Sequence, residues 1–184
     1  MEHIYNQEQF GENWFTYPTV YDSVVELFPS GSKFVEVGCW KGKSSAYMAV
    51  EIANSEKDID FYCVDHWEGG PDHKDWDVLS ELYTIWKTNM QPLKDYFIEM
   101  KMTSVEASTK FEDESLDFVF IDASHAYEDV KLDIETWMPK VKLGGIIGGH
   151  DYEDYFPSVK QAVNECLEGK EFDVYEKCWL HKKL

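Results

Sequence analysis

The sequence contains no arginine, so all 17 of its basic residues are lysines. With 36 acidic residues, the formal net charge is −19 at pH 7. Such a surface repels nucleic-acid phosphates and anionic membrane headgroups. Without arginine, the chain also lacks the usual bidentate clamp for a carboxylate or phosphate. The charge therefore disfavours DNA, RNA and membranes as partners and favours a small, neutral, hydroxylated molecule, although solubility alone explains it equally well.

Long apolar runs and closely spaced cysteine pairs are also absent. No run is long enough to span a bilayer, and the first residues lack a secretory pattern. The four cysteines show no C-x-x-C spacing. These absences predict a cytoplasmic protein with reduced thiols. A chain of 184 residues is long enough to bury one sizeable core.

Strand-like segments alternate with helical patterns along the chain, which is typical of an α/β fold. We predict a Rossmann-like, doubly wound sheet that is mostly parallel, with an antiparallel C-terminal strand and helices on both faces. The expected strands, seven in all, are 33–37, 60–64, 96–100, 116–121, 145–148, 172–175 and 178–181.

The whole chain, 1–184, is expected to form a single domain with two additions to the sheet. One is an N-terminal aromatic cap and helix at 1–31, and the other is a tryptophan-rich, lid-like insertion at 66–92. Both would lie near the carboxyl ends of the parallel strands, where open α/β sheets bind ligands. Either segment is therefore a candidate lid, and the alternative is that its aromatic residues simply pack against the sheet.

The most informative segment is Lys33-Phe-Val-Glu-Val-Gly-Cys-Trp-Lys-Gly-Lys-Ser-Ser45. It reads as a buried strand, a glycine-rich turn and the start of a helix. Such a turn brings backbone N–H groups and a helix N-terminus close to a bound ligand. Glu36 ends the strand with a carboxylate that would repel a pyrophosphate, so the pattern favours a nucleotide ligand without phosphates.

This segment resembles the first motif of class I S-adenosylmethionine-dependent methyltransferases, an acidic residue followed by G-x-x-x-G. That family has a seven-stranded sheet and a second acidic residue at the end of the next strand, which holds the ribose hydroxyls. Phe61-Tyr-Cys-Val-Asp65 supplies it here. The resemblance implies a cofactor site at Glu36, Gly38, Cys39, Trp40, Gly42, Asp65, Trp67, Ser104 and Asp122.

Two other interpretations compete with this one. A nicotinamide-dependent oxidoreductase of the Rossmann type requires G-x-G-x-x-G, but Trp40 stands where that pattern needs its second glycine. A non-catalytic binding module with the same fold would not need a polar cluster at the edge of the sheet. The sequence has such a cluster.

Asp122 and His125 follow one predicted strand, and His150 and Asp151 follow the next. Their pattern resembles small sugar and macrolide O-methyltransferases, cephalosporin-hydroxylase-like proteins and, more distantly, catechol O-methyltransferase. The resemblance implies a divalent cation held by Asp122, His150 and Asp151. His150 departs from the second carboxylate that relatives often carry, and imidazole suits zinc, manganese or iron better than magnesium.

A divalent cation would lower the pKa of an acceptor hydroxyl and orient it for attack on the sulfonium methyl group. His125 is the candidate general base, with Asp122 the other candidate catalytic residue. Alternatively, His125 caps the following helix or supports Asp122, and His150 is only a neutral hydrogen-bonding residue. The predicted activity is O-methylation of a sugar or a similar small molecule.

Overall fold

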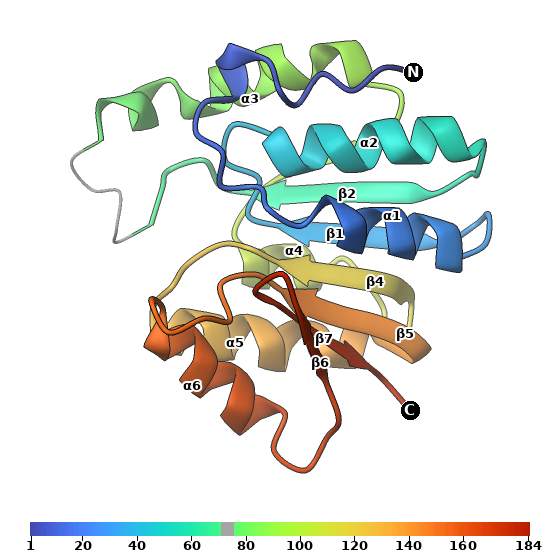
Figure 1. The fold of residues 1–184 in the computed structure, drawn as a ribbon, viewed down its shortest axis with the longest axis vertical. Coiled ribbons are helices and arrows are strands. Elements are labelled where there is room, and N and C mark those ends of the chain that lie inside the picture. Colours follow the sequence, from blue (N-terminus) through green and yellow to red (C-terminus); the bar gives the residue numbers. More distant parts are fainter. Residues whose placement is uncertain (71–75) are drawn as a thin grey trace.

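The computed structural model describes residues 1–70 and 76–184, and Figure 1 shows its fold. The described residues form a seven-stranded sheet in the order β3-β2-β1-β4-β5-β7-β6. Neighbouring strands from β3 to β5 run parallel, whereas β7 runs antiparallel to both β5 and β6. This topology confirms the predicted fold class. The strands are β1 (Lys33–Val37), β2 (Asp60–Asp65), β3 (Ile98–Lys101), β4 (Leu116–Ile121), β5 (Val141–Gly149), β6 (Asp173–Tyr175) and β7 (Cys178–Lys182).

Helices cover both faces of the sheet (Figure 1). One face packs against α1 (Pro18–Leu27), α2 (Lys43–Ser55) and α3 (Leu82–Met90), together with aromatic residues of the N-terminal segment. The other packs against α4 (Ser104–Ser108), α5 (Tyr127–Trp137) and α6 (Pro157–Cys166). Short 3-10 helices lie at Glu8–Phe10, Asp77–Ser80, Gln91–Leu93 and Met138–Lys140.

The central strands are buried on both faces, and the pleat decides which side chain meets which helix layer. Phe34 on β1 packs into the α1–α3 layer, whereas Val35 and Val37 pack into the α4–α6 layer. Glu36 shares the parity of Phe34, so its carboxylate is directed into the α1–α3 layer. This parity decides where the first acidic residue of the motif lies.

The strand order reverses between β1 and β4, and the carboxyl ends of these two strands lie side by side. The N–H of Asp122 donates to the carbonyl of Val37 at 2.8 Å, and the N–H of His150 donates to Ile121 at 3.1 Å. Gly38 makes the approach possible, since a Cβ there would lie 2.1 Å from the carbonyl oxygen of Asp122. Open α/β sheets bind ligands at such a switch point, so the fold brings the motif residues to the expected edge.

Helix α1 begins at Pro18, within the predicted N-terminal cap, because proline at the first turn of a helix sacrifices no intrahelical hydrogen bond. At its other end the Nζ of Lys57 donates to three carbonyl oxygens, at 2.6, 2.9 and 2.8 Å. These bonds satisfy acceptors that the end of a helix leaves without partners.

Residues 71–75 of the predicted lid-like insertion lie outside the described residues. Within the remainder, α3 directs Leu82, Trp86 and Met90 into the core. Trp86 also packs on Trp67, with ring centroids 4.4 Å apart. This helix of the insertion therefore belongs to the packed layer on the sheet, while Trp76 is 41% exposed.

Among the helices that the structure describes, none combines the length and the apolar character needed to cross a bilayer.

Candidate functional site

The turn between β1 and α2 closes on the carboxylate of Asp65 at the end of β2. Oδ2 of Asp65 accepts the backbone N–H groups of Cys39 at 2.9 Å and Trp40 at 3.1 Å. Oδ1 accepts the N–H of Trp67 at 2.7 Å. Because a carboxylate oxygen has two lone pairs, Oδ1 keeps one acceptor position for a further hydroxyl or N–H group.

Two tryptophans beside Asp65 have left-handed backbone conformations, Trp40 with φ 48° and Trp67 with φ 56°. Such conformations cost bulky residues about 1–3 kcal/mol each and cluster at functional sites. The indole N–H of Trp67 donates to the carbonyl of Trp40 at 3.1 Å. The Trp40 ring centroid lies 6.0 Å from that of Trp14 and 5.7 Å from that of Trp76. The N-terminal segment and the insertion therefore both reach the turn.

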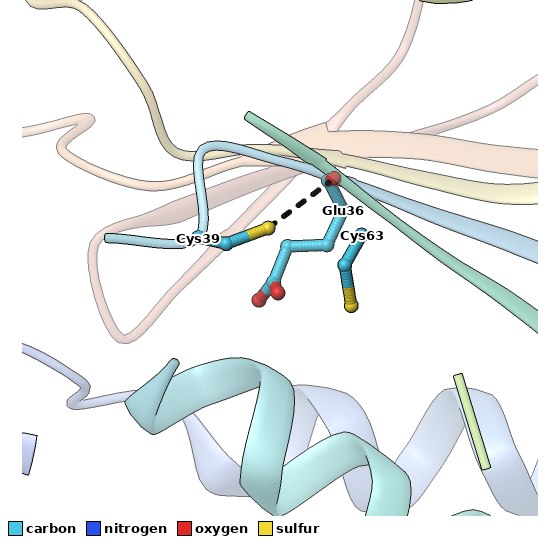
Figure 2. Close-up of side chains that lie close together, drawn as sticks. All are labelled: Glu36, Cys39 and Cys63. Atoms are coloured by element: carbon cyan, nitrogen blue, oxygen red, sulfur yellow. Dashed lines mark hydrogen bonds between the residues drawn. The ribbon is translucent and has the colours of Figure 1, made fainter. Parts of the chain in front are cut away.

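Glu36 lies beneath the turn instead of facing the ligand edge. Its side chain is buried, and its carboxylate accepts the hydroxyl of Tyr21 at 2.8 Å and the hydroxyl of Ser45. Figure 2 shows the carboxylate beside the thiols of Cys39 and Cys63. Burial raises the pKa of Glu36 to about 7, although the hydrogen bonds from its neighbours oppose the rise.

Ser104, the candidate adenine contact, is engaged with α5. Its hydroxyl donates to the carboxylate of Asp133 and accepts the indole N–H of Trp137 at 2.9 Å. Thr103 is the N-cap of α4, in a reciprocal capping box with Glu106. The side chain of Ser104 therefore holds α4 against α5.

The carboxyl ends of β4 and β5 bring three possible metal ligands together. One donor atom each from Asp122, His150 and Asp151 lies within 4.8 Å of the others. Nδ1 of His150 is 3.2 Å from Oδ1 of Asp151 and 3.8 Å from Oδ1 of Asp122. Asp151 has a left-handed backbone, with φ 61°. The structure thus places the imidazole between two carboxylates.

The protonation of this cluster is uneven. Burial raises the pKa of Asp122, and the charge of His150 opposes the rise while that of Asp151 adds to it. Burial also disfavours the ionised form of Asp151. The hydrogen bonds from His125 and His150 outweigh this effect of burial, and the pKa of Asp151 lies well below the usual range. For His150, the two carboxylates outweigh burial and raise the pKa. Asp151 is therefore the more strongly ionised carboxylate.

His125 belongs to the same cluster through Asp151. Its Nε2 lies 3.0 Å from Oδ2 of Asp151, and its ring stacks on Phe156 with centroids 4.1 Å apart. The hydroxyl of Ser158 donates to the His125 carbonyl at 2.7 Å. These contacts fix the imidazole next to the three possible metal ligands.

Two residues of the N-terminal segment also contact the cluster, and no motif in the sequence indicates them. Tyr17 donates its hydroxyl to Oδ2 of Asp122 at 2.6 Å, and Oγ1 of Thr16 lies 3.1 Å from Nε2 of His150. They lie in or beside the aromatic run before α1, which by itself predicts an aromatic cap and no contact with Asp122 or His150. Burial and nearby carboxylates keep the phenol neutral by raising the pKa of Tyr17.

The sheet order, the glycine turn and the acidic residue that ends β2 together define a class I S-adenosylmethionine-dependent methyltransferase. The family model described as a methyltransferase domain matches residues 35–152. The chain belongs to this methyltransferase family. The family match supports the methyltransferase interpretation over the nicotinamide-dependent alternative.

One curated relative matches about two thirds of the chain in sequence. The uncharacterized protein y4gI of Sinorhizobium fredii is 29% identical over 121 residues, which are 66% of this chain. The chain spans only 13% of the length of that relative.

Solved structures with the same fold share little sequence with this chain. The O-methyltransferase NovP has a TM-score of 0.67 and 17% identity, covering 91% of this chain and 79% of its own. SMU.1697c from Streptococcus mutans, in complex with SAH, has a TM-score of 0.66 and 10% identity, covering 94% and 100%. CalS11, a TDP-rhamnose 3'-O-methyltransferase, has a TM-score of 0.63 and 11% identity, covering 90% and 76%.

Proposed function

We propose that the chain transfers a methyl group to a hydroxyl of a small neutral acceptor, a sugar or a similar molecule, with the help of a divalent cation. The observation that carries the proposal is the cluster of Asp122, His150 and Asp151, placed beside the glycine turn at the switch point of the sheet. Hydroxyl oxygens are poor nucleophiles at neutral pH. A cation held by this cluster would lower the pKa of an acceptor hydroxyl and so make its oxygen a better nucleophile.

S-adenosylmethionine fits the edge formed by the turn and Asp65. The remaining acceptor position on Oδ1 of Asp65 suits a ribose hydroxyl. Gly38 and Gly42, both with φ near +90°, shape the turn. Trp67 is buried against Trp86, and it supports the turn through its indole N–H bond to the carbonyl of Trp40. The side chains of three other candidate residues face the protein interior and support the turn and the strands around it without contacting the cofactor. These residues are Glu36, Cys39 and Ser104.

The donor set fits a divalent cation. Two carboxylates and an imidazole suit manganese, iron or zinc better than magnesium. Tyr17 and Thr16 supply the outer hydrogen bonds that orient ligating side chains. A bound cation supplies Lewis acidity, which lowers the pKa of a coordinated hydroxyl.

Methyl transfer forms a bond from the acceptor oxygen to the methyl carbon as the sulfur–carbon bond breaks, so the hydroxyl proton must leave. We assign its removal to His125, whose imidazole is held by Asp151 and Phe156 at the edge of the cluster. Such proton transfer contributes about 10²–10⁴-fold to rate. Asp122 and Asp151 balance the charge of an imidazolium formed there.

The nature of the acceptor is inferred from charge and from a relative. A chain with net charge −19 and no arginine is poorly suited to an anionic acceptor. CalS11, which shares the fold, is a TDP-rhamnose 3'-O-methyltransferase. This neighbour supports a sugar hydroxyl as the acceptor group, whereas the neutral charge of the acceptor rests on the composition of this chain alone. The aromatic residues Trp14 and Trp76 lie beside the turn and are the candidate lid. A cytoplasmic location stays a prediction, as does the division into a cap and a lid.

Metal binding is tested without knowledge of the acceptor. Calorimetric titration with Mn²⁺ should show one site per chain, which Asp151→Asn abolishes and the surface change Asp154→Asn leaves intact. Activity is then measured as transfer of a labelled methyl group to a panel of sugars and catechols, with and without a chelator. Full turnover in the chelator would remove the cation from the mechanism and leave acid–base catalysis alone.

The role of His125 is tested in the same assay. His125→Ala should lower kcat by about 10²–10⁴-fold while the affinity for S-adenosylhomocysteine stays nearly unchanged. Turnover equal to that of the unmodified protein would exclude His125 as the base. Loss of Mn²⁺ affinity with kcat intact would instead assign it a supporting role through Asp151.

A further inference from the structure

A second group of possible metal ligands occurs in the described part of the chain, and the proposed methyl transfer makes no use of its sulfur atoms. One donor atom each from Glu36, Cys39 and Cys63 lies within 4.8 Å of the others. The three residues are buried, with exposed fractions of 1%, 2% and 0%. Figure 2 shows the carboxylate and the Cys63 sulfur pointing from the sheet toward the helix layer, with the Cys39 sulfur beside them.

The backbone fixes this arrangement from two strands and one turn. Glu36 on β1 and Cys63 on β2 are direct partners in the parallel register, so their side chains leave the same face of the sheet. Cys39 returns to this face through the turn, where its thiol contacts the carbonyl oxygen of Val64 at 3.6 Å. The cluster therefore forms part of the rigid base of the turn.

Two thiols and a carboxylate are a donor set that favours zinc and cadmium over magnesium and calcium. The groups that orient such a carboxylate are already in place, since Tyr21 and Ser45 both donate hydrogen bonds to Glu36. When a cation binds, the two S–H bonds break, two sulfur–metal bonds form, and the protons pass to solvent. The donors then carry three negative charges, which a divalent cation and the two donated hydrogen bonds largely offset.

We infer that Glu36, Cys39 and Cys63 form a binding site for a thiophilic divalent cation of the zinc and cadmium class, in the base of the cofactor turn. A cation there joins Cys39 to β2. The backbone N–H of Cys39 also donates to Asp65 at 2.9 Å, so the same cation restrains the contact between the turn and Asp65. This site is separate from the Asp122 cluster, whose three possible ligands contain no sulfur.

The test uses the full chain and Cd²⁺ alone. Because the donors are buried, the protein is unfolded and refolded with Cd²⁺, and the excess metal is removed by dialysis. We expect a thiolate-to-cadmium charge-transfer band and a cadmium-113 resonance at the position of two sulfur ligands. A resonance in the oxygen and nitrogen region only, or no bound cadmium beyond the Asp122 cluster, would overturn the inference.

Variants then assign the sulfur atoms. Cys39→Ser and Cys63→Ser should each lose the two-sulfur resonance, whereas Cys166→Ser and Cys178→Ser should keep it. Cys178 is the sharper control, because its thiol lies close to the other cluster: burial raises the pKa of Cys178, and the Asp122 carboxylate adds to the rise. Loss of the resonance in Cys178→Ser alone would place the cadmium elsewhere.

The outer hydrogen bond gives a graded readout. If a cysteine variant fails to fold, the cadmium resonance of the unmodified chain still decides the inference. Tyr21→Phe removes one hydrogen-bond donor to Glu36 and should weaken Cd²⁺ binding by about 10- to 100-fold. Unchanged Cd²⁺ affinity in Tyr21→Phe would exclude the Glu36 carboxylate as a ligand.

Discussion

Replacing Gly38 by alanine tests the close approach of the cofactor turn to the strand that carries Asp122. Gly38 has φ +91°, and an added Cβ would lie 2.1 Å from the carbonyl oxygen of Asp122 and 2.6 Å from its carbonyl carbon. The Cα of Ala123 is 2.8 Å away. All three atoms belong to the backbone, so no side-chain rotation relieves the clash.

The expected cost has two parts. A left-handed conformation costs an alanine about 1–2 kcal/mol relative to glycine. Forcing a methyl group into a filled space adds about 1–3 kcal/mol through backbone shifts. Gly38→Ala should therefore lower the free energy of unfolding by about 2–5 kcal/mol, and should also weaken cofactor binding because the turn or Asp122 must move.

Gly31 offers a matched control. It has φ +88°, and an added Cβ there would meet nothing within 4 Å. Gly31→Ala should therefore show only the conformational cost of about 1–2 kcal/mol. Urea denaturation of both variants measures the difference. Equal midpoints for the two variants would refute the claim that the turn is pressed against Asp122.

Three further perturbations test other parts of the structure. Burial raises the pKa of Glu36 from 4.5 to about 7, so the folded state binds the carboxyl proton more tightly than the unfolded state. Ionisation of Glu36 should therefore lower the free energy of unfolding by about 3 kcal/mol as the pH rises from 4.5 to 7. Glu36→Gln should remove this pH dependence, as measured by urea denaturation at several pH values. The same pH dependence in the variant and the unmodified protein would contradict the burial of a titrating carboxyl group. Tyr17→Phe removes the hydrogen bond to Asp122 and should lower the free energy of unfolding by about 1.5–3 kcal/mol. The affinity for Mn²⁺ should fall by about 10- to 100-fold. Unchanged Mn²⁺ affinity in calorimetry would show that Tyr17 does not support the metal site. Lys57→Met removes three hydrogen bonds to the end of α1 and should lower the free energy of unfolding by about 1–3 kcal/mol. The control Lys94→Met, at an exposed position, should leave the free energy of unfolding unchanged. Equal free energies of unfolding for the two variants would contradict the role of Lys57.

Much of the fold could be predicted because its signals are local. Alternating strand and helix patterns predict the seven strands, and parallel strands necessarily bring their carboxyl ends to one edge. For that reason Asp122, His125, His150 and Asp151 could be placed together from the sequence, and the structure brings them together.

The remaining features depend on contacts that no local pattern encodes. Tyr17 reaches Asp122 across 105 residues of sequence, and nothing in the aromatic cap indicates a hydrogen bond at that edge. The orientation of Glu36 depends on which helices cover which face of the sheet, so the motif alone suggests a ligand contact where the structure shows a buried carboxylate. Ser104 likewise faces α5 because Asp133 and Trp137 meet it there.

Calorimetric titration with S-adenosylhomocysteine tests the central claim most directly, using the unmodified protein, Asp65→Ala and Asp65→Asn, with NADH as the competing ligand. We predict one S-adenosylhomocysteine per chain, no heat from NADH, and affinity lower by about 1–3 kcal/mol in Asp65→Ala. Asp65→Asn keeps one side-chain oxygen that can accept the backbone N–H groups of the turn. This variant therefore separates the loss of a cofactor contact from a collapse of the turn. Binding of NADH without binding of S-adenosylhomocysteine would contradict the account.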